Sequence, residues 1–192
     1  MNSTTIFHRA FTKEIKKFRV GSHFGNSRQA IVAIAAHLFI DGCKEETAYL
    51  YECDIAASDC EYVSTDDWGS PKIQALLYAY LGAVGETLKF ATEYQRGITS
   101  SKCSETKSME YLSIEINMRK HVGIKYQNAV ECLGESVCIL DPKRLVIKSV
   151  TAIKKCCITK AFSGLNSKQF GISEEDFSFA IGRAQSYCPS AA

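Results

Sequence analysis

Histidine and cysteine are the residues of this chain best suited to metal binding, acid–base chemistry and redox chemistry. The chain of 192 residues has nine cysteines and four histidines, which are His8, His23, His37 and His121. No Cys-x-x-Cys pair and no cysteine–histidine cluster at zinc spacing occurs in the sequence. Because the cysteine count is odd and Met1 to Thr12 lack a secretory signal, we expect mostly reduced thiols and a cytoplasmic protein.

Motifs of enzymatic chemistry are also missing from the sequence. No Ser/His/Asp order, glycine-rich phosphate loop or paired acidic motif is found. The acidic run Glu174, Glu175 and Asp176 coincides with an expected helix start, where negative charge is favourable. We therefore expect a protein that is not an enzyme, with no metal and no cofactor.

The composition is that of a globular chain. It is 46% hydrophobic and 23% charged, and the formal net charge of +2 arises from interspersed acidic and basic residues. The small cluster Lys13, Lys16, Lys17 and Arg19 is interpreted as a solvated helix face, and no basic block typical of nucleic-acid binders occurs. The longest apolar stretch, Ile31 to Ile40, has about half of the ~20 residues that a membrane span needs. The sequence thus predicts neither a nucleic-acid partner nor a membrane span.

Apolar residues recur at helical spacing in six stretches, which predicts an all-α protein. The stretches run over residues 7–18, 31–38, 76–88, 126–140, 146–157 and 177–184. Helix starts are indicated by Ser70-Pro71, by Asp141-Pro142 and by Ser173 with Asp176. Polar residues 95–107 and 164–171 are interpreted as loops. Residues 122–124 and 144–147 have some strand character, but each run is too short to outweigh its neighbours.

Two segments resemble parts of the globin family. The run Gly69 to Leu76, followed by Leu81-Gly82-Ala83, is similar to the start of the globin distal helix. The run Leu112 to Val122 is similar to the proximal helix, and Ala48 to Asp54 resembles the turn before the distal helix. The resemblance implies an all-α, globin-like crossed-helix fold forming a single domain over residues 1–192. It spans about residues 28–165, flanked by an N-terminal amphipathic helix (1–27) and an additional C-terminal helix (166–192).

The resemblance places aliphatic residues where globins hold heme. Leu76 corresponds to the distal histidine, Ile116 to the proximal histidine, and Leu50 to the heme-packing phenylalanine. An isoleucine has no lone pair for iron, whereas globin iron is held by a proximal imidazole. A heme-free relative is therefore expected. If heme is bound nevertheless, His121 is the candidate ligand, although it corresponds to a histidine near a heme propionate.

A heme-free globin-like fold either fills its pocket or reuses it for an apolar ligand such as a fatty acid. The expected pocket is lined by Leu50, Leu76, Leu77, Tyr80, Ile116 and Val122. Arg119 and His121 are the polar groups expected at its mouth. Our hypothesis is a heme-free globin-like protein that binds or senses an apolar ligand. The alternatives are a helical protein–protein interaction module with a filled core, expected as a homodimer, and a divergent heme globin for oxygen or redox sensing.

Overall fold

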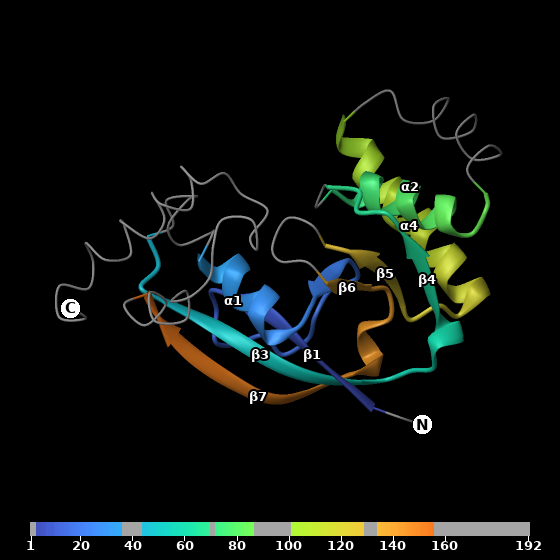
Figure 1. The fold of residues 1–192 in the computed structure, drawn as a ribbon. Coiled ribbons are helices and arrows are strands. Elements are labelled where there is room, and N and C mark those ends of the chain that lie inside the picture. The colour runs from blue at the N-terminus through green and yellow to red at the C-terminus, as the bar shows by residue number, and fades with distance from the viewer. Residues whose placement is uncertain (1–2, 36–43, 70–71, 87–100, 129–133, 156–192) are drawn as a thin grey trace.

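The computed structural model describes residues 3–35, 44–69, 72–86, 101–128 and 134–155. It is a mixed α/β structure with two β-sheets (Figure 1). The all-α, globin-like crossed-helix fold expected from the sequence is therefore wrong.

The first sheet is antiparallel and consists of three strands, in the order β1 (Ser3–Ala10), β3 (Thr47–Ala56) and β7 (Leu145–Lys154). Side chains of a strand alternate between its two faces. In β3 this alternation buries Tyr51, Cys53 and Ile55, while Glu52 and Asp54 lie on the other face. The long edge strand β7 is rich in Val, Ile and Thr, the residues that favour extended backbone.

The second sheet has four strands, in the order β2 (Ser22–Phe24), β6 (Glu135–Ile139), β5 (Gly123–Gln127) and β4 (Tyr62–Thr65). Strands β4 and β5 are parallel, and a parallel pair needs a long crossover connection. That connection contains helices α2 (Ile73–Ala83) and α4 (Ser101–Arg119). A single bridge between Phe7 and Gly25 joins the two sheets.

The second sheet lies between the two helices and the first sheet (Figure 1). Cys138 of β6 packs with Leu77, Leu81 and Leu112 of α2 and α4. Its neighbours in β6, such as Ile139, point to the opposite face and pack with side chains of the first sheet, such as Tyr51. Both faces of β6 are therefore buried.

Helix α1 (Ser27–Ala35) lies against β1 and β3. It begins with a reciprocal cap, in which the amide of Gln29 donates to Oδ1 of Asn26 and the amide of Asn26 donates to Oε1 of Gln29. None of the described helices is long and apolar enough to cross a membrane.

Several segments expected to be helical are strands. The expected N-terminal helix (1–27) contains β1 and β2, and residues 48–54, expected as a turn, lie within β3. The expected long helix over 126–140 contains the end of β5 and all of β6, and residues 146–154 lie in β7. In each case the apolar residues are spaced compatibly with a helix. Those such as Ile6 in β1 and Ile139 in β6 are buried, whereas Val146 and Val150 of β7 are 63% and 39% exposed.

Helices were predicted correctly for α1, α2 and the second half of α4. The beginning of α4 was predicted as a loop, because residues 101–107 are polar. Asp141 caps a helix start as predicted, but the helix is the single 3-10 turn η3 (Pro142–Arg144). Ser70-Pro71, His37 and the additional C-terminal helix (166–192) lie outside the described residues.

Candidate functional site

A cleft of about 790 Å³ opens where three segments distant in the sequence meet. This volume lies in the range typical of small-molecule sites. Most of its lining comes from the segment before β2, the last turns of α4, and the turn between β6 and β7, and Glu61 is added from the turn before β4. The lining residues are Lys17, Phe18, Arg19, Val20, Glu61, Met109, Ser113, Ile116, Asn117, Lys120, His121, Leu140, Asp141, Pro142, Lys143 and Arg144.

A tight turn from Arg19 to Ser22 holds the first wall of the cleft. The amide of Ser22 donates to the carbonyl of Arg19 at 3.2 Å, and Gly21 has a φ of +87°. A positive φ at the third turn position defines a type II turn and favours glycine there. The amide of Gly21 also donates to the carbonyl of Ile139 at 2.8 Å, which anchors the turn to β6. Lys17 and Arg19 are thereby placed beside the cleft.

The end of α4 forms the second wall. The amide of Lys120 donates to the carbonyl of Ile116 at 2.8 Å, and Lys120 then leaves the helix with a φ of 60°. The chain continues through His121 into β5, whose start is fixed by the amide of Val122 bonded to the carbonyl of Glu61 at 2.7 Å. This geometry holds Lys120 and His121 in the cleft lining.

The 3-10 turn η3 provides the third wall. Oδ1 of Asp141 accepts from the amide of Lys143 at 3.2 Å, and Pro142 occupies the first helical position, where its missing N–H costs nothing. The amide of Asp141 donates to the carbonyl of Val122 at 3.1 Å, which ties η3 to the chain next to His121. Lys143 and Arg144 therefore lie close to the end of α4.

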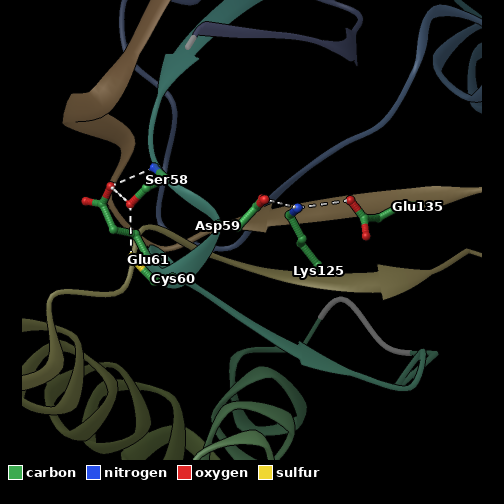
Figure 2. A network of polar contacts seen from close by, with 6 residues as sticks. All are labelled: Ser58, Asp59, Cys60, Glu61, Lys125 and Glu135. Atoms are coloured by element: carbon green, nitrogen blue, oxygen red, sulfur yellow. Dashed lines mark hydrogen bonds and ion pairs between the residues drawn. The ribbon is translucent and has the colours of Figure 1, made fainter. Parts of the chain in front are cut away.

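Glu61 fixes Arg144 at the base of the cleft. Glu61 is the last residue of the 3-10 turn η2 (Asp59–Glu61). Its Oε2 accepts a hydrogen bond from the amide of Ser58 at 2.8 Å and another from the Ser58 hydroxyl at 2.9 Å (Figure 2). Its Oε1 lies 3.0 Å from Nη2 of Arg144. The bonds from Ser58, and then the charge of Arg144, hold the pKa of Glu61 below its usual value.

The same turn η2 is fastened to the second sheet by Lys125. Nζ of Lys125 lies 3.0 Å from Oδ1 of Asp59 and 3.4 Å from Oε1 of Glu135, between the two carboxylates (Figure 2). Asp59 is almost fully exposed, so each pair contributes little on its own. The two ion pairs instead fix the position of η2, because they join it to strands β5 and β6.

The cleft carries an excess of positive charge. Its lining has five cationic side chains and two carboxylates, a net formal charge of +3 with His121 neutral. Arg144 is paired with Glu61. Among the residues that the structure describes, no hydrogen bond or ion pair engages the side chains of the other four cations, which are Lys17, Arg19, Lys120 and Lys143. These charges outweigh the partial negative charge at the C-terminal end of α4, which is equivalent to about half an elementary charge.

The remaining lining combines the polar residues Ser113, Asn117 and His121 with apolar side chains that come from the core. Phe18 belongs to the core between the two sheets, whereas Ile116 and Leu140 belong to the core under α2 and α4. The cleft therefore lies over the junction of the two cores. This arrangement combines an apolar floor with unpaired cations, so it can bind a molecule that has an apolar part and an anionic group.

A second cavity, of about 240 Å³, lies between β1, β2 and α1 and contains two histidines. Nδ1 of His8 donates to the carbonyl of His23 at 2.7 Å, and Nδ1 of His23 lies 2.7 Å from the hydroxyl of Tyr126. Burial lowers the pKa of His8 to about 4 and also lowers the pKa of His23. His8 and His23 are thus already engaged in hydrogen bonds within the chain. This cavity is therefore a weaker candidate for a ligand site than the cleft.

The pocket residues expected from the sequence are only partly brought together. Leu76, Leu77, Tyr80 and Ile116 pack in one core, but Val122 lies in the other core and Leu50 pairs with Arg9 across the first sheet. Of these residues, Ile116 lines the cleft. Of the two expected polar groups, His121 lines the cleft, while Arg119 is bound to Glu115 and Glu86 at 2.9 and 3.0 Å.

Sequence reasoning missed the basic residues of the cleft. The sequence pattern assigns Lys17 and Arg19 to a solvated helix face, and it predicts the cap at Asp141 without indicating a role for Lys143 and Arg144. Their proximity depends on the pairing of β2 with β6 and on the bonds of Val122 to Glu61, Leu140 and Asp141. No spacing in the sequence indicates these contacts.

Three of the described cysteines differ in their surroundings. Cys53 and Cys138 are buried and Cys60 is exposed, and all three are free. Burial raises the pKa of Cys53 and that of Cys138 to about 12, so neither thiol ionises readily. Within the described ranges, no group of three or more His, Cys, Asp or Glu residues is arranged to hold a metal ion.

Comparison of the chain with protein-family models, with curated proteins and with solved structures finds no match. The function has to be inferred from the chemistry of the cleft.

Proposed function

We propose that this protein binds a small anionic amphiphile in the cleft, with its anionic group among the basic side chains and its apolar part over Phe18, Ile116 and Leu140. The observation that carries the proposal is the presence of four cations without a described partner around an apolar floor. A fatty acid has this chemistry, and so does an alkyl phosphate. The role is binding or sensing, not catalysis.

The basic side chains argue for an anionic group on the ligand. Cations placed together repel one another, so their proximity lowers stability unless a counter-charge is bound. Three lysines and Arg19, together with the guanidinium of Arg144, can accommodate a phosphate or a carboxylate. The backbone adds to this argument, because Lys120 occupies a left-handed conformation that favours glycine.

The experiment compares three probes with the same eight-carbon chain by isothermal titration calorimetry: octyl phosphate, octanoate and octanol. We expect the two anions to bind with one site per chain and octanol to bind far more weakly. Equal affinity for all three probes would show that charge plays no part, and absence of binding would contradict the proposal.

Matched variants locate the binding. Replacing Lys17, Lys120 and Lys143 with alanine removes three cleft cations and is expected to weaken octyl phosphate binding by about tenfold or more. The control replaces Lys16, Lys44 and Lys154, three exposed lysines outside the cleft lining. If both triple variants lose affinity equally, the attraction is due to net charge and not to the cleft.

A second role, protein–protein interaction as a homodimer, is favoured by the outer face of α4. Tyr111, Ile114 and Met118 recur at spacings of three and four residues and are 39%, 53% and 63% exposed. Such a stripe is the pattern by which two helices pack. Sedimentation velocity over a range of concentrations tests this role. A dimer that dissociates in the double variant Ile114→Lys/Met118→Lys would support it, and a wild-type monomer at all concentrations would contradict it.

A cytoplasmic location belongs to the same proposal. The free thiols Cys53, Cys60 and Cys138 support it, because thiols persist in a reducing compartment. Fractionation of cells that express the tagged protein tests this location.

A further inference from the structure

Tyr80 of α2 and His121, which follows α4, form a hydrogen-bonded pair beneath the cleft. The Tyr80 hydroxyl lies 2.9 Å from Nδ1 of His121. Tyr80 is completely buried, whereas the His121 ring lines the cleft. The pair therefore connects the core under α2 and α4 to the proposed ligand.

The direction of this hydrogen bond follows from the burial of Tyr80. Among the described residues, its hydroxyl has no hydrogen-bond partner other than His121. If Nδ1 of His121 donated the hydrogen, the hydroxyl hydrogen of Tyr80 would be left buried without an acceptor, which is unfavourable. Tyr80 therefore donates and Nδ1 of His121 accepts. A neutral imidazole that accepts at Nδ1 carries its hydrogen on Nε2.

The surroundings of His121 also keep its ring neutral. An imidazolium would carry a hydrogen on Nδ1 and would force the bond with Tyr80 to reverse. Burial, and then the charge of Arg119, lower the pKa of His121. Arg119 is the charged group that lowers the pKa of the ring, and the lining of the cleft adds Lys17, Arg19, Glu61, Lys120, Asp141, Lys143 and Arg144. Glu61 is bound to Arg144 and Asp141 caps the Lys143 amide, so the positive groups dominate.

We infer that Tyr80 is a positioning residue for the cleft, because its donated hydrogen bond holds His121 in the tautomer that presents Nε2–H to the anionic group of the ligand. This inference rests on the proposed binding function. It adds that the neutral Nε2–H group of His121 donates a hydrogen bond to an oxygen of the ligand's anionic group. Because burial and the charge of Arg119 lower the pKa of His121, this donor stays neutral to a lower pH than a free histidine would. Affinity for an anion that does not itself titrate is thus expected to depend less on pH than it would with a free imidazole.

The tautomer is tested without any ligand. Long-range ¹H–¹⁵N correlation spectra of the histidine rings, assigned with the variant His121→Asn, distinguish the two neutral forms. We expect the Nε2–H form for His121 in the wild-type protein and a mixture of forms in Tyr80→Phe. A wild-type ring that carries its hydrogen on Nδ1 would overturn the inference.

The effect on binding is tested with octyl sulfonate, whose charge is independent of pH. For the wild-type protein, we expect the dissociation constant to be unchanged from about pH 8 to about pH 6.5, the ordinary pKa of histidine. For Tyr80→Phe, we expect binding about fivefold weaker at pH 8 and a gap that narrows as the pH falls, because without the Tyr80 hydrogen bond Nδ1 of His121 takes up a proton more readily.

The matched control is Tyr126→Phe, which removes a tyrosine–histidine hydrogen bond at His23, outside the cleft. If both variants change affinity equally, or if Tyr80→Phe remains independent of pH, the role of Tyr80 is only structural and the inference fails. Failure of the wild-type protein to bind any anionic probe would instead overturn the binding function itself, whatever tautomer is found.

Discussion

The amide of Lys120 donates to the carbonyl of Ile116 at 2.8 Å, while Lys120 itself has a φ of 60°. This is the backbone geometry in which many helices end, with a left-handed residue directly after the last helical one. Glycine is the usual residue there, because a side chain in this conformation costs about 1–2 kcal/mol. Among the described residues, Lys120 is the only non-glycine residue with a positive φ. We attribute the retention of a strained lysine to its charge in the cleft.

Replacing Lys120 with glycine should stabilise the free protein and weaken the binding of an anion. We expect the free energy of unfolding to rise by up to about 1 kcal/mol, because the strain is relieved at some entropic cost. Urea unfolding and titration with octyl phosphate measure the two effects. Lys120→Ala is the control, since it removes the same charge but keeps the strain. Equal or lower stability of the glycine variant would show that Lys120 is not strained.

Acid should destabilise the protein through His8. Its pKa is about 4 in the folded state because the ring is buried, compared with an ordinary value of 6.5. As the pH falls below 6.5, the unfolded chain takes up a proton that folded His8 does not. Stability is therefore fully present above about pH 6.5 and declines toward pH 4, by on the order of 3 kcal/mol.

Urea unfolding at a series of pH values checks this decline. His8→Asn retains a donor toward the carbonyl of His23 but cannot titrate, so its unfolding free energy should fall less steeply over the same window. Burial also lowers the pKa of His23, so the stability of the His8→Asn variant should still fall partly with decreasing pH. Parallel curves for the two proteins would exclude His8 as a cause of acid sensitivity.

The close contact of β5 with β6 should make Gly123 intolerant of a side chain. A Cβ at this position would lie 2.9 Å from the carbonyl oxygen of Cys138 and 2.9 Å from Cγ1 of Val137. We expect Gly123→Ala to lower the free energy of unfolding by about 1–3 kcal/mol. Gly82 on α2 has open space around it, so Gly82→Ala should be neutral or stabilising by up to about 1 kcal/mol. Equal free energies of unfolding for Gly123→Ala and Gly82→Ala would contradict the close pairing of β5 with β6.

The bonds of Ser58 and Arg144 to Glu61 should give stability that is lost at low pH. Because the folded-state pKa of Glu61 is lowered, its contribution is present above its ordinary value of 4.5 and disappears as the pH falls through the lowered one. Glu61→Gln should therefore be less stable than the wild-type protein at neutral pH. The difference in urea midpoint should close in acid. A difference that persists unchanged would mean that ionisation of Glu61 is unimportant.

Helices α1 and α2 and the second half of α4 could be predicted from the sequence, but most strands could not. In β6, residues 136–139 are all buried, because one face of the strand meets the helices and the other meets the first sheet. Such a strand shows no alternation of polar and apolar residues, and periodicity alone cannot distinguish it from a buried helix. In β7, the i, i+4, i+7 spacing of Val146, Val150 and Ile153 favoured a helix, although its many β-branched residues favoured a strand.

The candidate site depends on contacts that the sequence does not indicate. Ile116 and His121 were predicted to lie at a ligand site because the resemblance to globins places Ile116 at the proximal-histidine position and His121 near a heme propionate. Lys17 and Lys143 approach them only through the pairing of β2 with β6 and the docking of η3 beside Val122. The strand character noted at residues 122–124 and 144–147 was the signal that could have led to this arrangement.

The most direct test of the central claim is an amide ¹H–¹⁵N correlation titration of the labelled wild-type protein with octyl phosphate. We predict shift changes that saturate at one probe per chain and are concentrated at Val20, Ser113, Asn117, Lys120, His121 and Lys143, all of which line the cleft. Saturable changes centred instead on His8 and His23, or no saturable change at all, would contradict the assignment of the cleft as the binding site.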